Sequence, residues 1–64
     1  MIEKYRNLIG KQVIAVTSSY GKIKGIWSDW LSEDSSEASI LIDKENGEII
    51  ELYETEILEI IEVN

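Results

Sequence analysis

Side chains that could act as nucleophiles or bases are limited in this chain, because its 64 residues include no histidine and no cysteine. A serine or threonine nucleophile would need a lysine or a carboxylate as its base, and no spacing in the sequence suggests such a pair. Asp and Glu together number 13, so closely spaced carboxylates follow from abundance alone and fit solvated strand and loop faces. We therefore predict that the protein is not an enzyme and has no catalytic residue.

The acidic cluster of Glu33, Asp34 and Glu37 comes closest to a metal site. It lacks the alternating ligands and the hinge glycine of a calcium-binding loop, so no metal ligand is predicted. Gly21 and Gly25 stand alone in the sequence, which excludes a glycine-rich loop that cradles phosphate. No cofactor is predicted.

The two halves of the chain carry opposite charge. Up to residue 24, five basic residues stand against one acidic residue, a net charge of +4, whereas the rest carries −11, for a total of −7. The summed field repels phosphate backbones, so nucleic-acid binding requires the basic side chains to converge on one face. The candidates for such a nucleic-acid face are Lys4, Arg6, Lys11, Lys22 and Lys24.

An exposed apolar patch is predicted around the second tryptophan. Alternation along a strand at residues 21–30 places Trp27 on the inner face and both Ile26 and Trp30 on the outer face. An outward tryptophan beside an isoleucine is typical of a protein-binding anchor. The alternative is that the N-terminal helix or the long loop folds over this pair. The predicted protein interface consists of Ile26, Trp30, Tyr20 and Tyr53.

The elements that must position these residues are one short helix and a series of strands. Residues 2–9 have the apolar spacing of a helix of about two turns, with Gly10 as its C-terminal cap. Turn signals at residues 18–21 and at Asn46-Gly47 separate hairpin strands. An acidic, solvated loop precedes the third strand. The first four strands are expected over residues 11–18, 21–30, 39–43 and 48–53.

Two segments are apolar in more than one way. Residues 13–16 are apolar on both faces, so this strand needs a second cover, either the helix or a partner chain. Residues 54–63 fit either a helix, with Ile57, Ile60 and Ile61 on one stripe, or a strand. Their β-branched residues favour a strand that follows a tight turn at residues 54–56.

Gly25 is the expected bend of the sheet. A glycine inside a strand costs stability, and its usual reason is a sharp bend or a close backbone approach. The sequence therefore predicts a single domain over residues 1–64, mainly β. A short N-terminal helix precedes a five-stranded, strongly bent antiparallel small barrel.

This order of elements resembles the small-barrel plan of the Sm-like (LSm) proteins, and SH3-like barrels match it nearly as well. The matching residues are LIGKQVIAV (8–16) for the helix end and first strand, KIKGI (22–26) for the second, and GEIIEL (47–52) with EILEI (56–60) for the last two. The resemblance implies a barrel. In that family, strand four of one subunit pairs with strand five of the next to build a ring.

The sequence departs from the family's RNA-binding pattern. Sm-like RNA binders place an aspartate and an asparagine around the loop after strand two, and a basic residue with glycine between strands four and five. Asp29 matches the first position, but the following loop has no asparagine, and residues 53–56 are Tyr-Glu-Thr-Glu. The family's RNA-binding residues therefore cannot be assigned here.

A chain this short buries a small core, and without cysteine its remaining supports are tight packing and self-association. We predict a cytoplasmic, non-membrane protein that acts by protein association with copies of itself, through the apolar patch and its unlike-charged ends. Two alternatives stay open. One is Sm-like nucleic-acid binding through the basic half, and the other is an acidic mimic of nucleic acid that occupies a basic partner.

Overall fold

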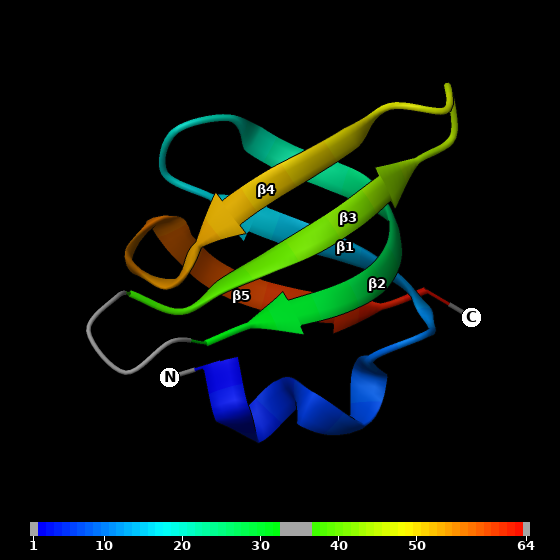
Figure 1. The fold of residues 1–64 in the computed structure, drawn as a ribbon. Helices are drawn as coiled ribbons and strands as arrows, with labels where there is room; N and C mark the ends of the chain where they lie inside the picture. The colour runs from blue at the N-terminus through cyan, green and yellow to red at the C-terminus, as the bar shows by residue number, and fades with distance from the viewer. Residues whose placement is uncertain (1, 33–36, 64) are drawn as a thin grey trace.

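A computed structural model describes residues 2–32 and 37–63 of the chain. These residues form five strands and two short 3₁₀ helices, and Figure 1 shows their arrangement. In chain order the elements are η1 (Ile2–Leu8), β1 (Gln12–Thr17), β2 (Gly21–Leu31), β3 (Ser39–Lys44), β4 (Ile49–Tyr53), η2 (Glu54–Glu56) and β5 (Ile57–Glu62). The acidic loop predicted before the third strand includes residues 33–36, which lie outside the described residues.

The strands form one antiparallel sheet in the order β4-β3-β2-β1-β5. The mainly β prediction is therefore confirmed, and the last segment is a strand entered through the turn η2. In this order β4 and β5 are the two edges. Each has only one neighbouring strand in the sheet.

Gly25 lies where β2 comes closest to β3. A Cβ atom at this position would collide with the backbone carbonyl oxygen of Asp43 and would lie 2.7 Å from Cγ2 of Ile42. The long strand β2 is strongly curved along its length (Figure 1). The close backbone approach predicted at Gly25 is confirmed, because only glycine leaves room for the neighbouring strand.

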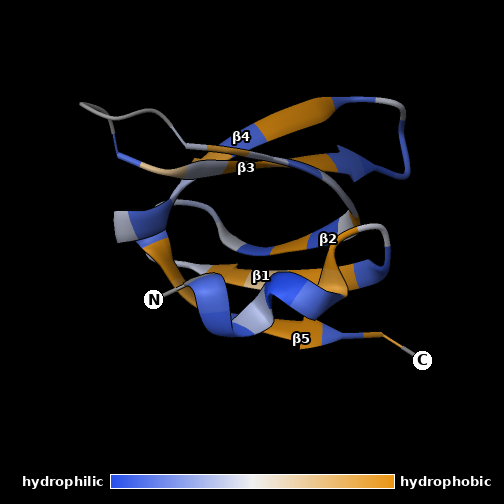
Figure 2. Ribbon diagram, turned by 60° about the horizontal axis from the view of Figure 1, so that its bottom comes forward, coloured by the Kyte–Doolittle hydropathy of each residue, from blue (hydrophilic) through white to orange (hydrophobic). Residues whose placement is uncertain are grey.

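The core lies on the concave side of the bent sheet. Alternate residues of β1 point inward, where Val13 and Ala15 are fully buried beside Trp27. Figure 2 shows that hydrophobic segments follow the strands, whereas the turns between them are largely hydrophilic. The nine buried apolar residues of this cluster are Leu8, Val13, Ala15, Ile23, Trp27, Ile40, Ile42, Leu52 and Ile60.

Two β-bulges change the alternation that the sequence predicts. In β2 the register with β3 shifts between Trp27 and Asp29, and in β5 the register with β1 shifts at the corresponding Val16–Thr17 step. Each shift adds one residue to a strand, so side chains three positions apart reach the same face. This is why Trp30 pairs with the fully buried Ile40 instead of pointing outward.

The N-terminal helix is tied to the core at its C-terminal end. Leu8 is buried in the cluster and Tyr5 packs against it, as a short helix that leans on the sheet requires. Gly10 has a φ of 89°, and its N–H donates to the Trp27 carbonyl oxygen at 2.7 Å. The Trp27 N–H in turn donates to the Lys11 carbonyl oxygen at 3.1 Å, so η1 is anchored to β2.

Candidate association site

The four residues predicted as a protein interface do not form one patch. Ile26 is on the outer face and pairs with Gln12 at the start of β1, whereas Tyr20 lies in the turn after the end of β1. Tyr53 is at the end of β4, on the far edge of the sheet. Trp30 is half-buried and packs against the core. The association role of each residue stays a prediction.

The prediction that Ile26 and Trp30 share the outer face is wrong. Because of the bulge in β2, the Trp30 indole turns inward, on the same side of the sheet as Trp27, and its Nε1 is buried without a hydrogen-bond partner. The guanidinium carbon of Arg6 lies 5.4 Å from the centre of the Trp30 ring. The alternative foreseen from the sequence, in which the N-terminal helix or the long loop covers Ile26 and Trp30, holds for Trp30, which Arg6 of the helix covers, but Ile26 is 47% exposed.

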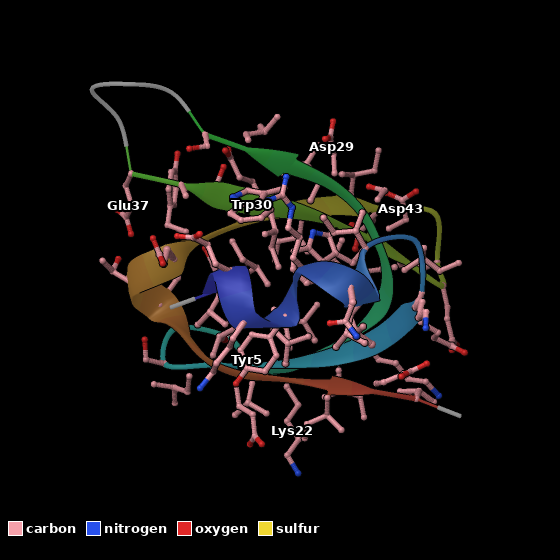
Figure 3. The ribbon with its side chains drawn as sticks, turned by 90° about the horizontal axis from the view of Figure 1, so that it is seen from below. Tyr5, Lys22, Asp29, Trp30, Glu37 and Asp43 are labelled. Atoms are coloured by element: carbon pink, nitrogen blue, oxygen red, sulfur yellow. The ribbon has the colours of Figure 1, made fainter. Side chains whose placement is uncertain are left out.

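The basic residues predicted as a nucleic-acid face come from η1, from the turn before β1 and from β2. Lys4 and Arg6 are on η1, where the Lys4 Nζ lies 5.2 Å from the centre of the Tyr5 ring. In Figure 3 the Lys22 side chain projects away from the molecule, whereas Trp30, which Arg6 covers, lies on the other side of η1. Arg6 and Lys22 therefore lie on different sides of the molecule, and the nucleic-acid role of the five residues stays a prediction.

Two further basic residues are already in ion pairs. The Lys11 ammonium lies 3.7 Å from a carboxylate oxygen of Glu62. The Lys24 ammonium lies 3.8 Å from a carboxylate oxygen of Glu45. Both pairs are solvent-exposed and each contributes about 0–1 kcal/mol to stability. They nevertheless reduce the charge that a phosphate backbone would meet.

The outer face of β1 carries the second apolar side of that strand. Ile14 and Val16 point away from the core and are only half-buried. Pairing across the sheet aligns them in two rows, Lys24–Ile14–Ile61 and Lys22–Val16–Glu59, that run from β2 through β1 to β5. We call these six residues the β1 face. No element among the described residues is placed over it, since η1 packs against the core instead.

Lys22 and Glu59 have no partner within the described part of the chain. Every other described lysine or arginine makes an ion pair or contacts an aromatic ring. Lys22 and Glu59 sit at the two ends of one row, with Val16 between them. Their Cα atoms are two strand spacings apart, about 9–10 Å, and no ion pair joins the two side chains in the described part of the chain.

The other carboxylates of β4 and its flanks are engaged locally. A carboxylate oxygen of Glu51 accepts a hydrogen bond from the Ser39 hydroxyl at 2.7 Å. The Asn46 side chain and the Lys44 ammonium hold the pKa of Glu48 below its ordinary value. Hydrogen bonds from the Thr55 side chain and from its backbone N–H, the latter at 2.7 Å, lower the pKa of Glu37. Each of these three carboxylates thus accepts a hydrogen bond within the chain.

None of the four residues predicted as a protein interface belongs to the β1 face. Its signal in the sequence is the strand that is apolar on both faces, residues 13–16, for which a partner chain was one of two expected covers. The alternation of lysine with isoleucine in the KIKGI segment (22–26) places two cations beside that strand. The acidic residue on the β5 side of β1 could not be predicted from the sequence, because β1 and β5 are far apart along the chain.

Comparison with known protein families, with curated proteins and with solved structures finds no match for this chain. Neither helix within residues 2–32 and 37–63 has the length and apolar character needed to cross a membrane. Over the same ranges, no three His, Cys, Asp or Glu side chains are grouped so that they could hold a metal ion. Glu33 and Asp34 of the acidic cluster lie outside these ranges.

Proposed function

We propose that this chain is a non-enzymatic, cytoplasmic association module that forms a dimer with a second copy of itself through the β1 face. The observation that carries the proposal is the row Lys22–Val16–Glu59, in which two unpartnered opposite charges flank an apolar side chain. A patch of this kind is complementary to itself, as a two-fold interface requires.

Only one orientation of the two-fold axis pairs the opposite charges of this row. A two-fold axis in the contact plane, parallel to β1, places β2 of one copy against β5 of the other. Val16 then meets Val16 of the second copy, and Lys22 faces Glu59 of the second copy on both sides of the axis. An axis perpendicular to the strands would instead set lysine against lysine, which is repulsive. Burial of Ile14 and Val16 supplements the small core of each chain.

For the fold we propose a small barrel of the Sm-like or SH3-like type. It is supported by the bent β2 with Gly25 at its closest approach to β3, and by the position of β4 and β5 at the sheet edges. The ring of Sm-like proteins, which joins these two edges, is a less suitable assembly here. Glu51 on β4 and Glu59 and Glu62 on β5 would bring like charges together.

Sedimentation equilibrium of the wild type and of Lys22→Glu tests the proposal. We expect a dimer for the wild type, weakened by added salt, and a monomer for the variant, because two Glu–Glu contacts replace two ion pairs. Lys4→Glu is the matched control, since it makes the same charge change on η1. Equal molar masses for the wild type and Lys22→Glu would reject the β1 face as the interface.

A further inference from the structure

The free edge of β4 presents unpaired backbone groups in a defined order. The Lys44 N–H donates to the Glu48 carbonyl oxygen at 2.8 Å, and the Glu54 N–H donates to the Ala38 carbonyl oxygen at 2.9 Å. In an antiparallel ladder the hydrogen-bonded residues alternate, so even-numbered residues of β4 bond to β3. The N–H and C=O groups of Ile49 and Glu51 therefore point outward, away from the sheet.

The side chains of the same residues face the outer side and are exposed. Ile49 is 65% exposed and Tyr53 is 45% exposed, and Glu51 lies between them. On the neighbouring strand Asp43 pairs with Ile49 and adds a second carboxylate to this surface. One oxygen of Glu51 accepts the Ser39 hydroxyl and one oxygen of Asp43 accepts the Ser28 hydroxyl, so the second oxygen of each carboxylate is the one that a cation would meet. The edge thus offers an apolar, acidic, apolar series together with unused backbone donors and acceptors.

This edge ends sharply at Tyr53. The Tyr53 N–H donates to a carboxylate oxygen of Glu56 at 2.9 Å, so the next outward donor is already satisfied within the chain. The stretch open to strand addition is therefore short and centred on Glu51. Because the open stretch is short, it also limits non-specific pairing of this edge with strands of other chains.

The edge of β5 is built differently and does not complement β4. A bulge at its start breaks the regular ladder, which protects an edge from pairing. Its outward-pointing backbone groups include those of Glu62, because the Val63 N–H bonds to β1 at Gln12. Pairing of β4 with β5 of a second copy would set Glu62 near Glu51, so a second copy is not the favoured occupant.

From these observations we infer that the β4 edge binds an extended, basic segment of another protein by strand addition. In such a complex, side chains on the outer face lie opposite Ile49, Glu51 and Tyr53. The segment has an apolar residue, then a Lys or Arg two positions later, then an apolar residue two positions further. Because this series reads the same in both directions, it fits parallel and antiparallel addition.

The probe for this inference is a disulfide-closed hairpin peptide that displays Val-Thr-Arg-Thr-Val on its free edge. It is titrated into isotopically labelled Lys22→Glu chain, which the proposed dimer interface leaves monomeric, so the two proposals are tested separately. We expect slowed amide exchange at the N–H groups of Ile49 and Glu51. The already bonded N–H groups of Ile50 and Leu52 change less.

Matched variants and peptides decide the outcome. Ile49→Ser should weaken binding about tenfold, because it removes apolar area at the edge. Leu58→Ser, which is changed at an equally exposed residue on β5, should bind as the parent chain does. A peptide with Glu in place of Arg should bind at least tenfold more weakly. Equal binding of both peptides, or protection of β4 amides by protein concentration alone, would overturn the inference.

Discussion

Replacement of Gly25 by alanine tests the bend of β2, because two effects on stability have opposite signs. Gly25 is not among the glycines with positive φ, so an alanine there meets no backbone strain. If the new methyl group met no other atom, the change would stabilise the protein by about 0.4–1 kcal/mol, because alanine lowers the conformational entropy of the unfolded chain. Here the new Cβ would collide with the carbonyl oxygen of Asp43, a backbone atom of β3 that cannot rotate away.

Overpacking of this kind costs about 1–3 kcal/mol. The net effect expected for Gly25→Ala is a loss of about 1–2 kcal/mol in the free energy of unfolding. With a urea dependence of about 1 kcal/mol per molar, the unfolding midpoint should fall by about 1–2 M.

Fluorescence of the buried Trp27 reports unfolding in such a urea titration. Lys24→Ala serves as control, because it introduces alanine at the adjacent exposed position of the same strand. Both variants are compared at a concentration at which they are monomeric. A midpoint for Gly25→Ala equal to or above that of the wild type would refute the close approach of β2 and β3.

Trp30→Ala should lower the free energy of unfolding by about 1–3 kcal/mol, because this side chain packs against the core, and should leave the molar mass in sedimentation unchanged. Loss of the dimer without loss of stability would contradict its placement. Glu48 has a lowered pKa in the folded chain, so its stabilising contribution is complete above its ordinary value of about 4.5 and is lost as the pH falls below it. Glu48→Gln should therefore flatten the urea midpoint against pH in this range, and an unchanged slope would argue against the Asn46 and Lys44 contacts. In a filter-binding assay at low salt we expect no retention of single-stranded RNA, since Arg6 and Lys22 lie on different sides of the molecule and the net charge is −7. Retention that disappears on neutralising Lys22 would reverse this expectation.

The elements could be predicted from the sequence because their signals are local. Apolar residues alternate along the strands, and Asn46-Gly47 marks a hairpin turn in which Gly47 has a φ of 90°. The role of Gly25 was also readable, since a glycine inside a strand of otherwise good strand formers calls for a structural reason.

The bulges could not be predicted from the sequence, and the predicted outward orientation of Trp30 was wrong for that reason. A bulge adds one residue to a strand, and this changes the face of every later side chain. The Trp30 side chain therefore points inward, although strict alternation from Trp27 predicts that it points outward. The same effect in β5 brings Ile57 and Ile60, three positions apart, toward the core. That spacing is what made the segment resemble a helix.

The most direct test of the dimer exchanges the charges at the ends of its central row. Lys22→Glu and Glu59→Lys should each be monomeric in sedimentation equilibrium, because each creates like-charge contacts on both sides of the axis. Mixed in equal amounts, the two variants should form a heterodimer, since every Glu then meets a Lys. A mixture that stays monomeric, or either variant dimerising alone as the wild type does, would contradict the account.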